Sequence, residues 1–600
     1  MKTIKILSFF LLLVLPFSLG AALPPVFGAE YACQQDQLDR AFISPQRIVW
    51  KSVQKGSVSN EAILLLQGNS QADLTRNTLC SLTSTETDTA SILLDYGREL
   101  HGGLQLVLGS STRSRASFVR IRFGESVEEC NSEVVGNSGK RGYATNAHAM
   151  RDVVMEVPRE GTIEIGNTGF RFVRIDLLQP STTIRIKEAR AVLRYRDIPY
   201  LGSFRSSDKR LNDIWMTGAY TVHLNMQEYL WDGIKRDRIV WLGDMHPEVA
   251  TISTVFGNNE IVPQTLDLAC EQFPLPQWMN GMSAYSLWYL IIHHDWYRYS
   301  GDIEFLKKHK PYIVGLIDLI DSKVDENGIE TLSKNRFLDW PSSPNTEGVE
   351  SGYRALIVWA MQDAEVLCKA LDEPASAAKA QACAKKMNRW VKDPNKLKQA
   401  ASLMAIAGIL DPRKACDEVV SVGGAKDFST FYGYYMLQAQ ALAGQYQQAI
   451  DIIRQYWGGM LDMGATTFWE DFNLDWMENA GRIDELLPPG KKDIHGDFGA
   501  YCYPGFRHSL CHGWASGPTA WLSEHVLGVK VQEPGCRVIR LEPHLGDLQW
   551  VEGSFPTPYG LVRIKHVKDE KGGIHSSVDG PSEVTVLSDG KVGKLEEKTH

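Results

Sequence analysis

Short apolar stretches rich in β-branched or alternating residues dominate the part of the chain that follows the N-terminal segment. They are separated by Gly, Asn and Ser, residues that favour turns, and this pattern is typical of strands. The stretches lie at 62–68, 90–97, 102–110, 116–126, 162–178 and 182–195. We therefore predict an antiparallel β-sandwich domain over residues 30–203.

The hydrophobic period changes to that of a helix after Ser206, Ser207 and Asp208, a polar cluster suited to capping a helix. An apolar stripe at helical spacing follows from Leu211 to Tyr229. Roughly a dozen helices with short Gly, Pro or Asp connections favour packed hairpins in a closed double ring. This pattern assigns residues 204–528 to a helical domain. The clearest segments are 284–299, 303–323, 353–371, 375–391, 397–409, 430–443, 445–457 and 515–526.

Strand-like patterning returns near the C-terminus. It covers residues 537–545, 548–560, 561–567, 573–578 and 582–588. The alternation is again that of half-buried strands. We predict a second, smaller β-sandwich over residues 529–600.

The N-terminus predicts export. Lys2 and Lys5 precede the apolar run at 6–22, and small residues follow it, as in a signal peptide cleaved between Gly20 and Ala29. We assign residues 1–29 to this signal peptide. No later stretch reaches the length of uncharged apolar sequence that a membrane span requires, so the mature chain is expected in the periplasm or outside the cell, without membrane insertion.

Composition narrows the function. A chain of 600 residues is too long for one core, and a net charge of −9 gives no basic surface for nucleic acid. Ten cysteines are too few for a disulfide scaffold and lack zinc spacing, so most are expected to be core thiols. A bridge between Cys502 and Cys511 remains open. The expected partner is a carbohydrate, because tryptophans recur beside acids and sugar rings pack on indole.

The stretch "WDGIKRDRIVWLGD", residues 231–244, mixes charges with two tryptophans and two glycines. A surface face does not need the tryptophans, and a core face cannot hold the charges, so the mixture predicts a lined cavity. The alternative is a capped helix end with a salt-bridge network. The candidate residues here are Asp232, Arg236, Asp237, Trp241 and Asp244.

A second group of candidates lies further along the chain. Glu470 follows Trp469 in "GATTFWEDFN", and a carboxylate beside a large ring suits proton transfer. The ring of Trp469 is itself a candidate sugar contact. His512 and Trp514 lie in a Gly-rich loop at 503–522, where two histidines without a third ligand do not predict a metal, and no cofactor is expected.

Asp339 and Trp340 end a turn in "RFLDWPSSPNTEG", residues 336–348. We take both as candidate sugar contacts. A helix-capping role is the competing interpretation for Asp339.

Three motifs together give a family resemblance. "DGIKRDRIVWLGD" resembles DCPQRDERxGWxGD, the signature of α-L-rhamnosidases of glycoside hydrolase family 78. "GATTFWEDFN" resembles the family's GATTxWExW, and "SLCHGWASGP" resembles its SxNHYAxG. Segments 93–106, 169–175 and 540–560 resemble the β domains that flank the family's catalytic domain. The resemblance implies a multidomain fold with a central (α/α)6 barrel between an N-terminal antiparallel β-sandwich and a small C-terminal one.

The resemblance also implies an inverting mechanism with a general acid and a general base. Glu470 matches the family's base. The acid motif differs by one lost residue, and Asp237 stands four residues before Trp241, as the family's acidic Glu does. Asp237 is therefore the predicted acid, and Glu248 is the reserve candidate.

The remaining candidates take binding roles under this resemblance. Asp232 and His512 would bind sugar hydroxyls, and Trp241 would form an apolar wall. Asp244 would contact the sugar or brace the loop, and Arg236 or Arg238 would pair with the acids.

Three hypotheses follow, and the sequence leaves the oligomeric state open. The first is an exported, exo-acting enzyme that releases terminal α-L-rhamnose from plant polysaccharide or glycosides. The second is a glycosidase of another terminal sugar on the same barrel. The third is a non-catalytic carbohydrate-binding relative, and an unrelated structural or adhesion role is a more distant alternative.

Overall fold

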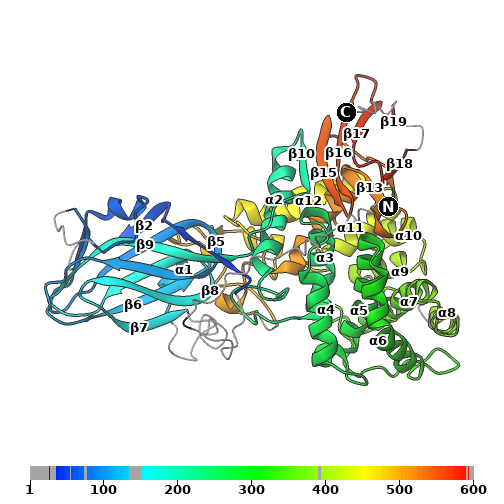
Figure 1. The fold of residues 1–600 in the computed structure, drawn as a ribbon, viewed down its shortest axis with the longest axis horizontal. Helices are drawn as coiled ribbons and strands as arrows, with labels where there is room; N and C mark the ends of the chain where they lie inside the picture. Colours follow the sequence, from blue (N-terminus) through cyan, green and yellow to red (C-terminus); the bar gives the residue numbers. More distant parts are fainter. Residues whose placement is uncertain are drawn as a thin grey trace, which may run out of the picture.

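The computed structural model describes residues 36–588 except 54–55, 73–77, 134–150, 390–392 and 502, together with Val26 and the strand at 592–593. Apart from Val26, the predicted signal peptide therefore lies outside the described residues, as do residues 594–600. In the described part, no helix is both long enough and apolar enough to cross a bilayer. Figure 1 shows a β domain at one side of a helical body, with a second group of strands packed on that body.

The N-terminal β domain is one nine-stranded antiparallel sheet, ordered β3-β4-β9-β5-β8-β6-β7, with β1 on β9 and β2 on β5. Irregular pairing between Asp95 and Leu100 interrupts the long β5–β8 ladder. Inward-facing aliphatic and aromatic side chains of these strands pack together in one core, as between the layers of a β-sandwich. The strands are β1 (Asp39–Ile43), β2 (Arg47–Lys51), β3 (Ser57–Ser59), β4 (Cys80–Thr83), β5 (Ala90–Leu108), β6 (Ser117–Gly124), β7 (Asp152–Val157), β8 (Gly161–Leu177) and β9 (Thr183–Tyr195).

The helical domain begins where the polar cluster predicts it. Asp208 is the N-cap of α2, and its carboxylate accepts hydrogen bonds from the backbone of Arg210 and Leu211. The main helices are α2 (Lys209–Asn225), α3 (Met245–Val255), α4 (Ile261–Gln272), α5 (Ser283–Ser300), α6 (Ile303–Asp321), α7 (Thr346–Ala370), α8 (Pro374–Asn388), α9 (Lys398–Ile406), α10 (Pro412–Ala415), α11 (Gly433–Leu442), α12 (Tyr446–Asp462) and α13 (Gly517–Trp521).

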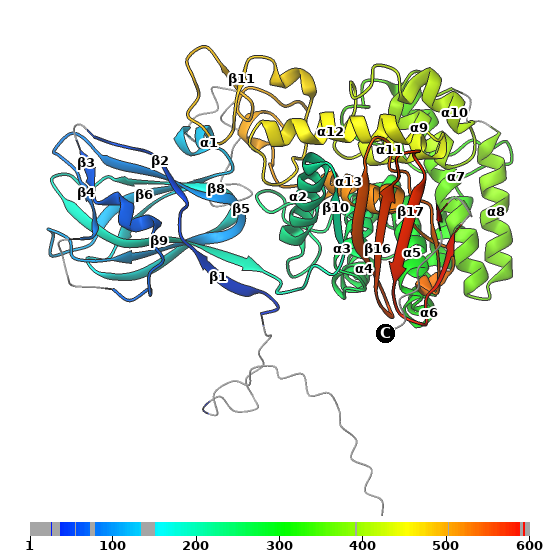
Figure 2. The ribbon, with the colours of Figure 1, turned by 90° about the horizontal axis from the view of Figure 1, so that it is seen from above.

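These helices form two concentric rings. Packing runs from α3 to α5, α7, α9, α11 and α13 and returns to α3, which closes an inner ring of six. The helices α4, α6, α8, α10, α12 and α2 alternate with the inner helices along the chain, and Figure 2 shows α8, α10 and α12 at the periphery of the helical body. Alternation of inner and outer helices along the chain is the (α/α)6 barrel that the motifs imply, and it buries the all-apolar faces of helices such as α11.

The C-terminal strands form two small sheets. One has the order β13-β14-β18, and the other β10-β15-β16-β17-β19. The second sheet differs from the sequence prediction, because β10 (Ser203–Ser206) comes from before the barrel and pairs with β15. The other strands are β13 (Val529–Val531), β14 (Val538–Leu541), β15 (Trp550–Thr557), β16 (Gly560–Lys568), β17 (Ile574–Asp579), β18 (Thr585–Ser588) and β19 (Val592–Gly593).

The two β regions contact different parts of the barrel. Val531 of β13 and Phe555 of β15 line a hollow with Tyr299 and Leu442, which end α5 and α11. The N-terminal domain instead contacts the loops that precede the inner helices, for example where Arg238 donates to the Asn167 carbonyl at 2.7 Å. The N-terminal ends of the inner helices are therefore framed by the N-terminal domain.

Candidate active site

A cavity of about 340 Å³ lies at the N-terminal ends of inner helices α3, α5, α7 and α13. Its walls come from the loops that lead into these helices and from the loop between α12 and α13. Ten of the eleven predicted site residues line it together, although they are drawn from positions 232 to 514. They are Asp232, Arg236, Asp237, Trp241, Asp244, Asp339, Trp340, Glu470, His512 and Trp514.

The loop 232–244 folds back on itself to reach the cavity. The Asp232 amide donates to the Ile239 carbonyl and the Ile239 amide donates to the Asp232 carboxylate, both at 3.1 Å. Asp237 and Arg238 at the loop tip have φ values of 51° and 56°. Two consecutive non-glycine residues in the left-handed region are uncommon and mark a strained, tight turn. The strain lies where the motif is one residue shorter than the family signature.

Glu470 is buried and firmly held. Its Oε1 accepts from Nη2 of Arg236, and its Oε2 accepts from the Ser509 amide at 3.1 Å. Its own backbone carbonyl accepts from Trp514 Nε1 at 2.9 Å and from Thr430 Oγ1 at 2.6 Å. The carboxylate is thus fixed from both sides at the cavity wall.

Asp237 is the more exposed of the two predicted catalytic acids, with 21% of its side chain accessible. Its Oδ2 accepts from Trp241 Nε1 at 3.1 Å, and its Oδ1 lies 3.3 Å from Nη1 of Arg236. Arg236 therefore contacts both Asp237 and Glu470. One guanidinium joins two carboxylates that are 233 positions apart in the chain and face the same cavity.

Three carboxylates surround the imidazole of His512. Its Nε2 lies 3.8 Å from Asp232 Oδ2, 3.8 Å from Asp244 Oδ2 and 3.6 Å from Glu470 Oε1. Burial and the charge of Arg236 hold the pKa of His512 well below its usual range, so the ring is neutral. A neutral imidazole among acids can both donate to and accept from sugar hydroxyls.

Asp232 and Asp244 form a pair of buried acids. Burial, followed by the negative charge of Asp244, raises the pKa of Asp232 well above its usual value. Burial does the same for Asp244, although the Tyr285 hydroxyl, which donates to it at 2.9 Å, acts in the opposite direction. A ligand rich in hydroxyl groups can supply the hydrogen bonds that these acids lack in the cavity.

The predicted tryptophans separate into two groups. Trp241, Trp340 and Trp514 line the cavity, and Trp514 stacks on Phe431 at 5.0 Å between ring centroids. Trp469 differs from the prediction: it is only 1% exposed, packs edge-on against Phe472 and does not line the cavity. Its position next to Glu470 places its ring in the core beneath the site, so packing and not sugar contact is its role in this structure.

Two further acids are bound by protein groups. Asp339 accepts from the Ser342 amide, from Gln399 Nε2 and from Ser429 Oγ, which ties the loop before α7 to α9. Glu248, the reserve acid, is fully buried on α3 and accepts from Asn225 Nδ2 at 3.3 Å. It does not line the cavity, so the structure favours Asp237 over Glu248 for proton donation.

Sequence reasoning did not select Tyr285 and Tyr503. Tyr285 lies in the first turn of α5 and binds Asp244, while the Tyr503 ring lies 5.3 Å from the guanidinium of Arg236. Tyr503 begins the Gly-rich loop at 503–522, so its aromatic ring could have been selected as a candidate site residue. Tyr285 had none, because it belongs to an ordinary apolar helix pattern.

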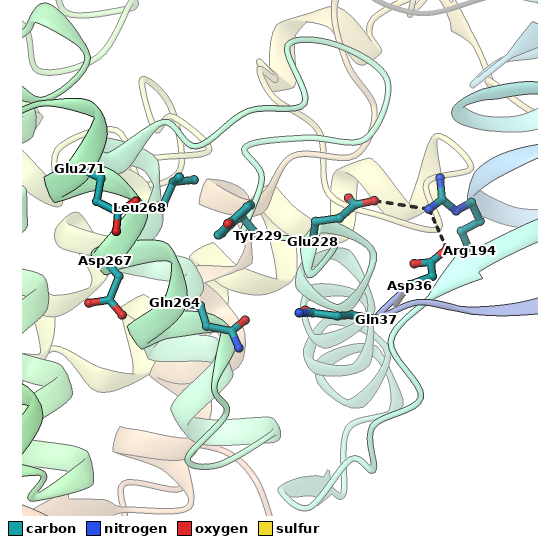
Figure 3. Close-up of a pocket in the computed structure, with 9 residues that line it drawn as sticks. All are labelled: Asp36, Gln37, Arg194, Glu228, Tyr229, Gln264, Asp267, Leu268 and Glu271. Atoms are coloured by element: carbon teal, nitrogen blue, oxygen red, sulfur yellow. Dashed lines mark hydrogen bonds and ion pairs between the residues drawn. The ribbon is translucent and has the colours of Figure 1, made fainter. Parts of the chain in front are cut away.

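A second hollow of about 530 Å³ opens between the N-terminal domain and α4 (Figure 3). Three of the four acids that line it have ion-pair partners: Arg194 pairs with Asp36 and Glu228, and Asp267 pairs with Lys308. Only one aromatic ring, that of Tyr229, is among the described residues that line it. The barrel cavity, with its tryptophans and opposed acids, is therefore the better candidate active site.

The described cysteines are free thiols, and Cys511 is one of those that are buried. Cys502, the partner considered for it, lies outside the described residues.

Comparison with known proteins gives two domain matches. Residues 199–403 match the bacterial α-L-rhamnosidase six-hairpin glycosidase domain, and residues 528–598 match the bacterial α-L-rhamnosidase C-terminal domain. A curated α-L-rhamnosidase of Alteromonas sp. (strain LOR) is 24% identical over 549 residues, which cover 82% of this chain and 55% of that protein. The chain thus spans about half the length of the curated relative it matches.

Solved structures show the same fold. A family 78 rhamnosidase of Bacillus sp. GL1 has a TM-score of 0.72 at 20% identity, covering 90% of this chain and 57% of its own. A rhamnosidase from Klebsiella oxytoca with rhamnose bound has a TM-score of 0.63 at 18% identity, covering 81% of this chain and 96% of its own.

Proposed function

Because residues 199–403 and 528–598 match bacterial α-L-rhamnosidase domain families, we propose that the protein is an exported, exo-acting glycoside hydrolase. Its substrate is a terminal α-L-rhamnose on plant polysaccharide or glycosides. One observation carries the proposal: Glu470 and Asp237, distant in sequence, line one cavity with a neutral histidine, three further acids and three tryptophans.

The proposed mechanism inverts the anomeric centre. In an inverting enzyme the two carboxyls stand roughly 6.5–9.5 Å apart, leaving space for the attacking water. Glu470 takes a proton from that water, and its ion pair with Arg236 and the hydrogen bond from the Ser509 amide orient its carboxylate for that step. Asp237 delivers a proton to the departing glycosidic oxygen. Asp232, Asp244 and His512 bind the sugar hydroxyls, and the tryptophans cover the ring faces.

Hydrolysis of an aryl α-L-rhamnoside tests the proposed activity. The wild type is expected to cleave it, and Glu470→Gln to lose roughly 10²–10⁴-fold in kcat while still binding L-rhamnose by calorimetry. Proton NMR of the first product should show the β anomer, as inversion requires. Cleavage of only another aryl glycoside supports the second hypothesis, and binding without cleavage by the wild type supports the non-catalytic one.

Asp237 is tested by the leaving group. Asp237→Asn should slow substrates with poor leaving groups far more than activated aryl substrates, because the latter need little protonation. Glu248→Gln is the comparison variant, and its activity on both substrates shows whether the acid behind the cavity takes part. Equal losses on both substrates in Asp237→Asn would assign that residue to binding.

Export is tested at the N-terminus. The secreted protein should begin between positions 20 and 30, as the small residues after the apolar run at 6–22 predict. Mass spectrometry of the periplasmic and culture fractions measures this, and an intact Met1 in those fractions would contradict it.

A further inference from the structure

The N-terminal β domain inserts one segment into the base of the candidate active site. This segment joins the end of β6 to the short helix α1 (Val127–Asn131). The Val127 amide donates to the Ile483 carbonyl at 2.9 Å, and Ser126 Oγ lies 2.8 Å from His495 Nδ1. Hydrogen bonds from the N-terminal domain therefore help to hold the loop between α12 and α13 of the barrel.

Glu125 is the centre of this contact. It is completely buried, and its Oε2 accepts from the Leu510 amide at 2.8 Å. Its Oε1 lies 3.3 Å from Ser509 Oγ. A carboxylate from the β domain thus holds two consecutive residues of the loop that precedes α13.

Lys235 provides the opposite charge. Its Nζ lies 2.7 Å from Glu125 and 3.3 Å from Glu129, and it donates to the carbonyls of Phe506 and His508 at 2.9 and 2.8 Å. Burial alone would lower the pKa of Lys235, but the two carboxylates outweigh burial and raise it, so the ammonium stays charged.

The same carboxylates resemble a metal site. Ligand atoms of Glu125, Glu129 and His495 all lie within 4.8 Å of one another. His495, however, is satisfied by Ser126 Oγ and by the His508 carbonyl, and the ammonium of Lys235 already contacts both carboxylates. The cluster is therefore complete with a lysine as its cation.

Lys235, and Leu510, which donates to Glu125, each lie one residue from a group that binds Glu470. Leu510 follows Ser509, whose amide donates to Glu470 Oε2 at 3.1 Å. Lys235 precedes Arg236, whose Nη2 donates to Glu470 Oε1. The buried pair consequently fixes the two donors that orient the carboxylate, one on each oxygen.

We propose that Glu125 and Lys235 are positioning residues for Glu470, so that the N-terminal β domain is required for hydrolysis and not only for stability. This inference rests on the proposed function, because it assigns Glu470 as the base. Neither residue lines the cavity, and both act through Ser509, Leu510 and Arg236.

Three variants test the proposal in the full-length chain. Glu125→Gln removes the charge in an almost isosteric side chain. The double variant Glu125→Met with Lys235→Met replaces both charges by apolar groups, a change that buried ion pairs often tolerate without loss of stability. Asp176→Asn is the matched control: it neutralises a buried, ion-paired carboxylate of the same domain, 2.8 Å from Arg122, that does not contact the barrel loops in the described interactions.

Kinetics and hydrogen–deuterium exchange are the measurements. The double variant should lose roughly 10–100-fold in kcat with KM changed less than about threefold, because small displacements of a catalytic group have effects of this size. Exchange should speed up in peptides covering 465–473 and 506–511. Asp176→Asn should keep its kcat within about twofold and its exchange in these peptides unchanged, even where its melting temperature falls.

Two results would overturn the inference. One is a folded double variant with wild-type kcat and wild-type exchange in both peptides. The other is an equal loss of kcat in Asp176→Asn, which would reduce the effect to general stability. If the wild type hydrolyses no aryl glycoside, the proposed function fails, and the exchange measurement alone still decides whether Glu125 and Lys235 hold the loops around Glu470.

Discussion

Burial raises the pKa of some acidic side chains at the cavity, and the guanidinium of Arg236 pairs with others. Asp232 and Asp244 are held toward their neutral forms, whereas Glu470 is joined to Arg236. Burial therefore suits Asp232 and Asp244 to binding neutral hydroxyls, and the contact with Arg236 fixes the orientation of the Glu470 carboxylate.

Asp471, next to Glu470, should make stability depend on pH. Burial, followed by the charge of Glu470, raises the pKa of Asp471 from 3.8 to about 7. The folded state then keeps a proton that the unfolded chain releases, so stability falls as pH rises from about 4 to 7 and stays low above it. Asp471→Asn cannot ionise and should be more stable than the wild type at pH 8, by up to about 4 kcal/mol.

Urea unfolding at pH 8 and at pH 4 measures this, and the advantage of Asp471→Asn should vanish at the lower pH. Asp475→Asn, at an exposed position four residues away, is the control. A constant difference between wild type and Asp471→Asn at both pH values would contradict the prediction.

Trp241 should act on Asp237 through its indole nitrogen. Trp241→Phe keeps an aromatic wall but removes the donor that lies 3.1 Å from Asp237 Oδ2. We expect kcat on a substrate with a poor leaving group to fall roughly tenfold, equivalent to about 1.4 kcal/mol. A double-mutant cycle with Asp237→Asn is the check. Additive losses in the cycle would show that the two residues act independently.

At the scale of elements, the loop before α13 connects every part of the site. It carries Ser509 against Glu470, His512 among the acids and Trp514 beneath the cavity. The loop reaches α2 and α3 because it has a glycine where it meets them: a Cβ at position 513 would lie 1.5 Å from Glu248 Oε1 and 2.7 Å from Asn225 Nδ2. Close approach of backbone to helix is therefore encoded by one small residue.

Gly513→Ala should displace this loop. The added methyl overlaps the completely buried carboxylate of Glu248, so we expect a loss of about 1–3 kcal/mol in the free energy of unfolding and a strong loss of activity. Urea unfolding and aryl glycoside hydrolysis measure the two effects. Adding Glu248→Ala should restore part of the stability. Wild-type stability in Gly513→Ala alone would show that the loop lies further from α3.

At the scale of the whole molecule, each β region is joined to the barrel by its own charged contacts. Glu125 of the N-terminal domain forms an ion pair with Lys235 of the barrel beside the cavity. Lys530 of the C-terminal strands lies 2.7 Å from Glu524 at the end of the barrel. The two attachments lie at opposite ends of the inner helices. Changes at the C-terminal attachment should therefore affect stability while leaving the site intact.

The pair formed by Glu524 and Lys530 should weaken in acid. Burial would raise the pKa of Glu524, but His525 and Lys530 outweigh it and lower the pKa from 4.5 to about 2. A lowered folded pKa means that the contribution to stability is complete above about pH 4.5 and is lost as pH falls toward 2. Glu524→Gln should thus unfold at a lower temperature than the wild type at pH 6, by a few degrees, and the difference should disappear near pH 2.5.

Thermal unfolding followed by circular dichroism measures this difference. Glu552→Gln, which removes an exposed pair with Lys565 in the C-terminal sheet, is the control and should show little change at either pH. The prediction fails if Glu524→Gln keeps the wild-type unfolding temperature at pH 6, or if its deficit persists unchanged in acid.

The local pattern of the chain was sufficient for the elements and for most of the site. Helical spacing and the Asp208 cap predicted α2, and the helices α5 to α9, α11 and α12 lie close to their predicted segments. Ten predicted residues line one cavity. They could be selected from the sequence because charged residues and tryptophans that occur together in glycine-rich loops are uncommon outside a site. These features depend on residues near one another in sequence, where spacing and chemistry can be read directly.

Contacts between distant segments were decided only by the tertiary structure. No local pattern distinguishes Trp469, which packs in the core, from Trp514, which lines the cavity, because burial depends on what the rest of the fold places over each ring. The pairing of β10 with β15, the shared guanidinium of Arg236 and the insertion of Glu125 beside Leu510 all join residues more than two hundred positions apart. Closure of the helical ring brings these groups together, and their charge and hydrogen-bonding requirements are met only there.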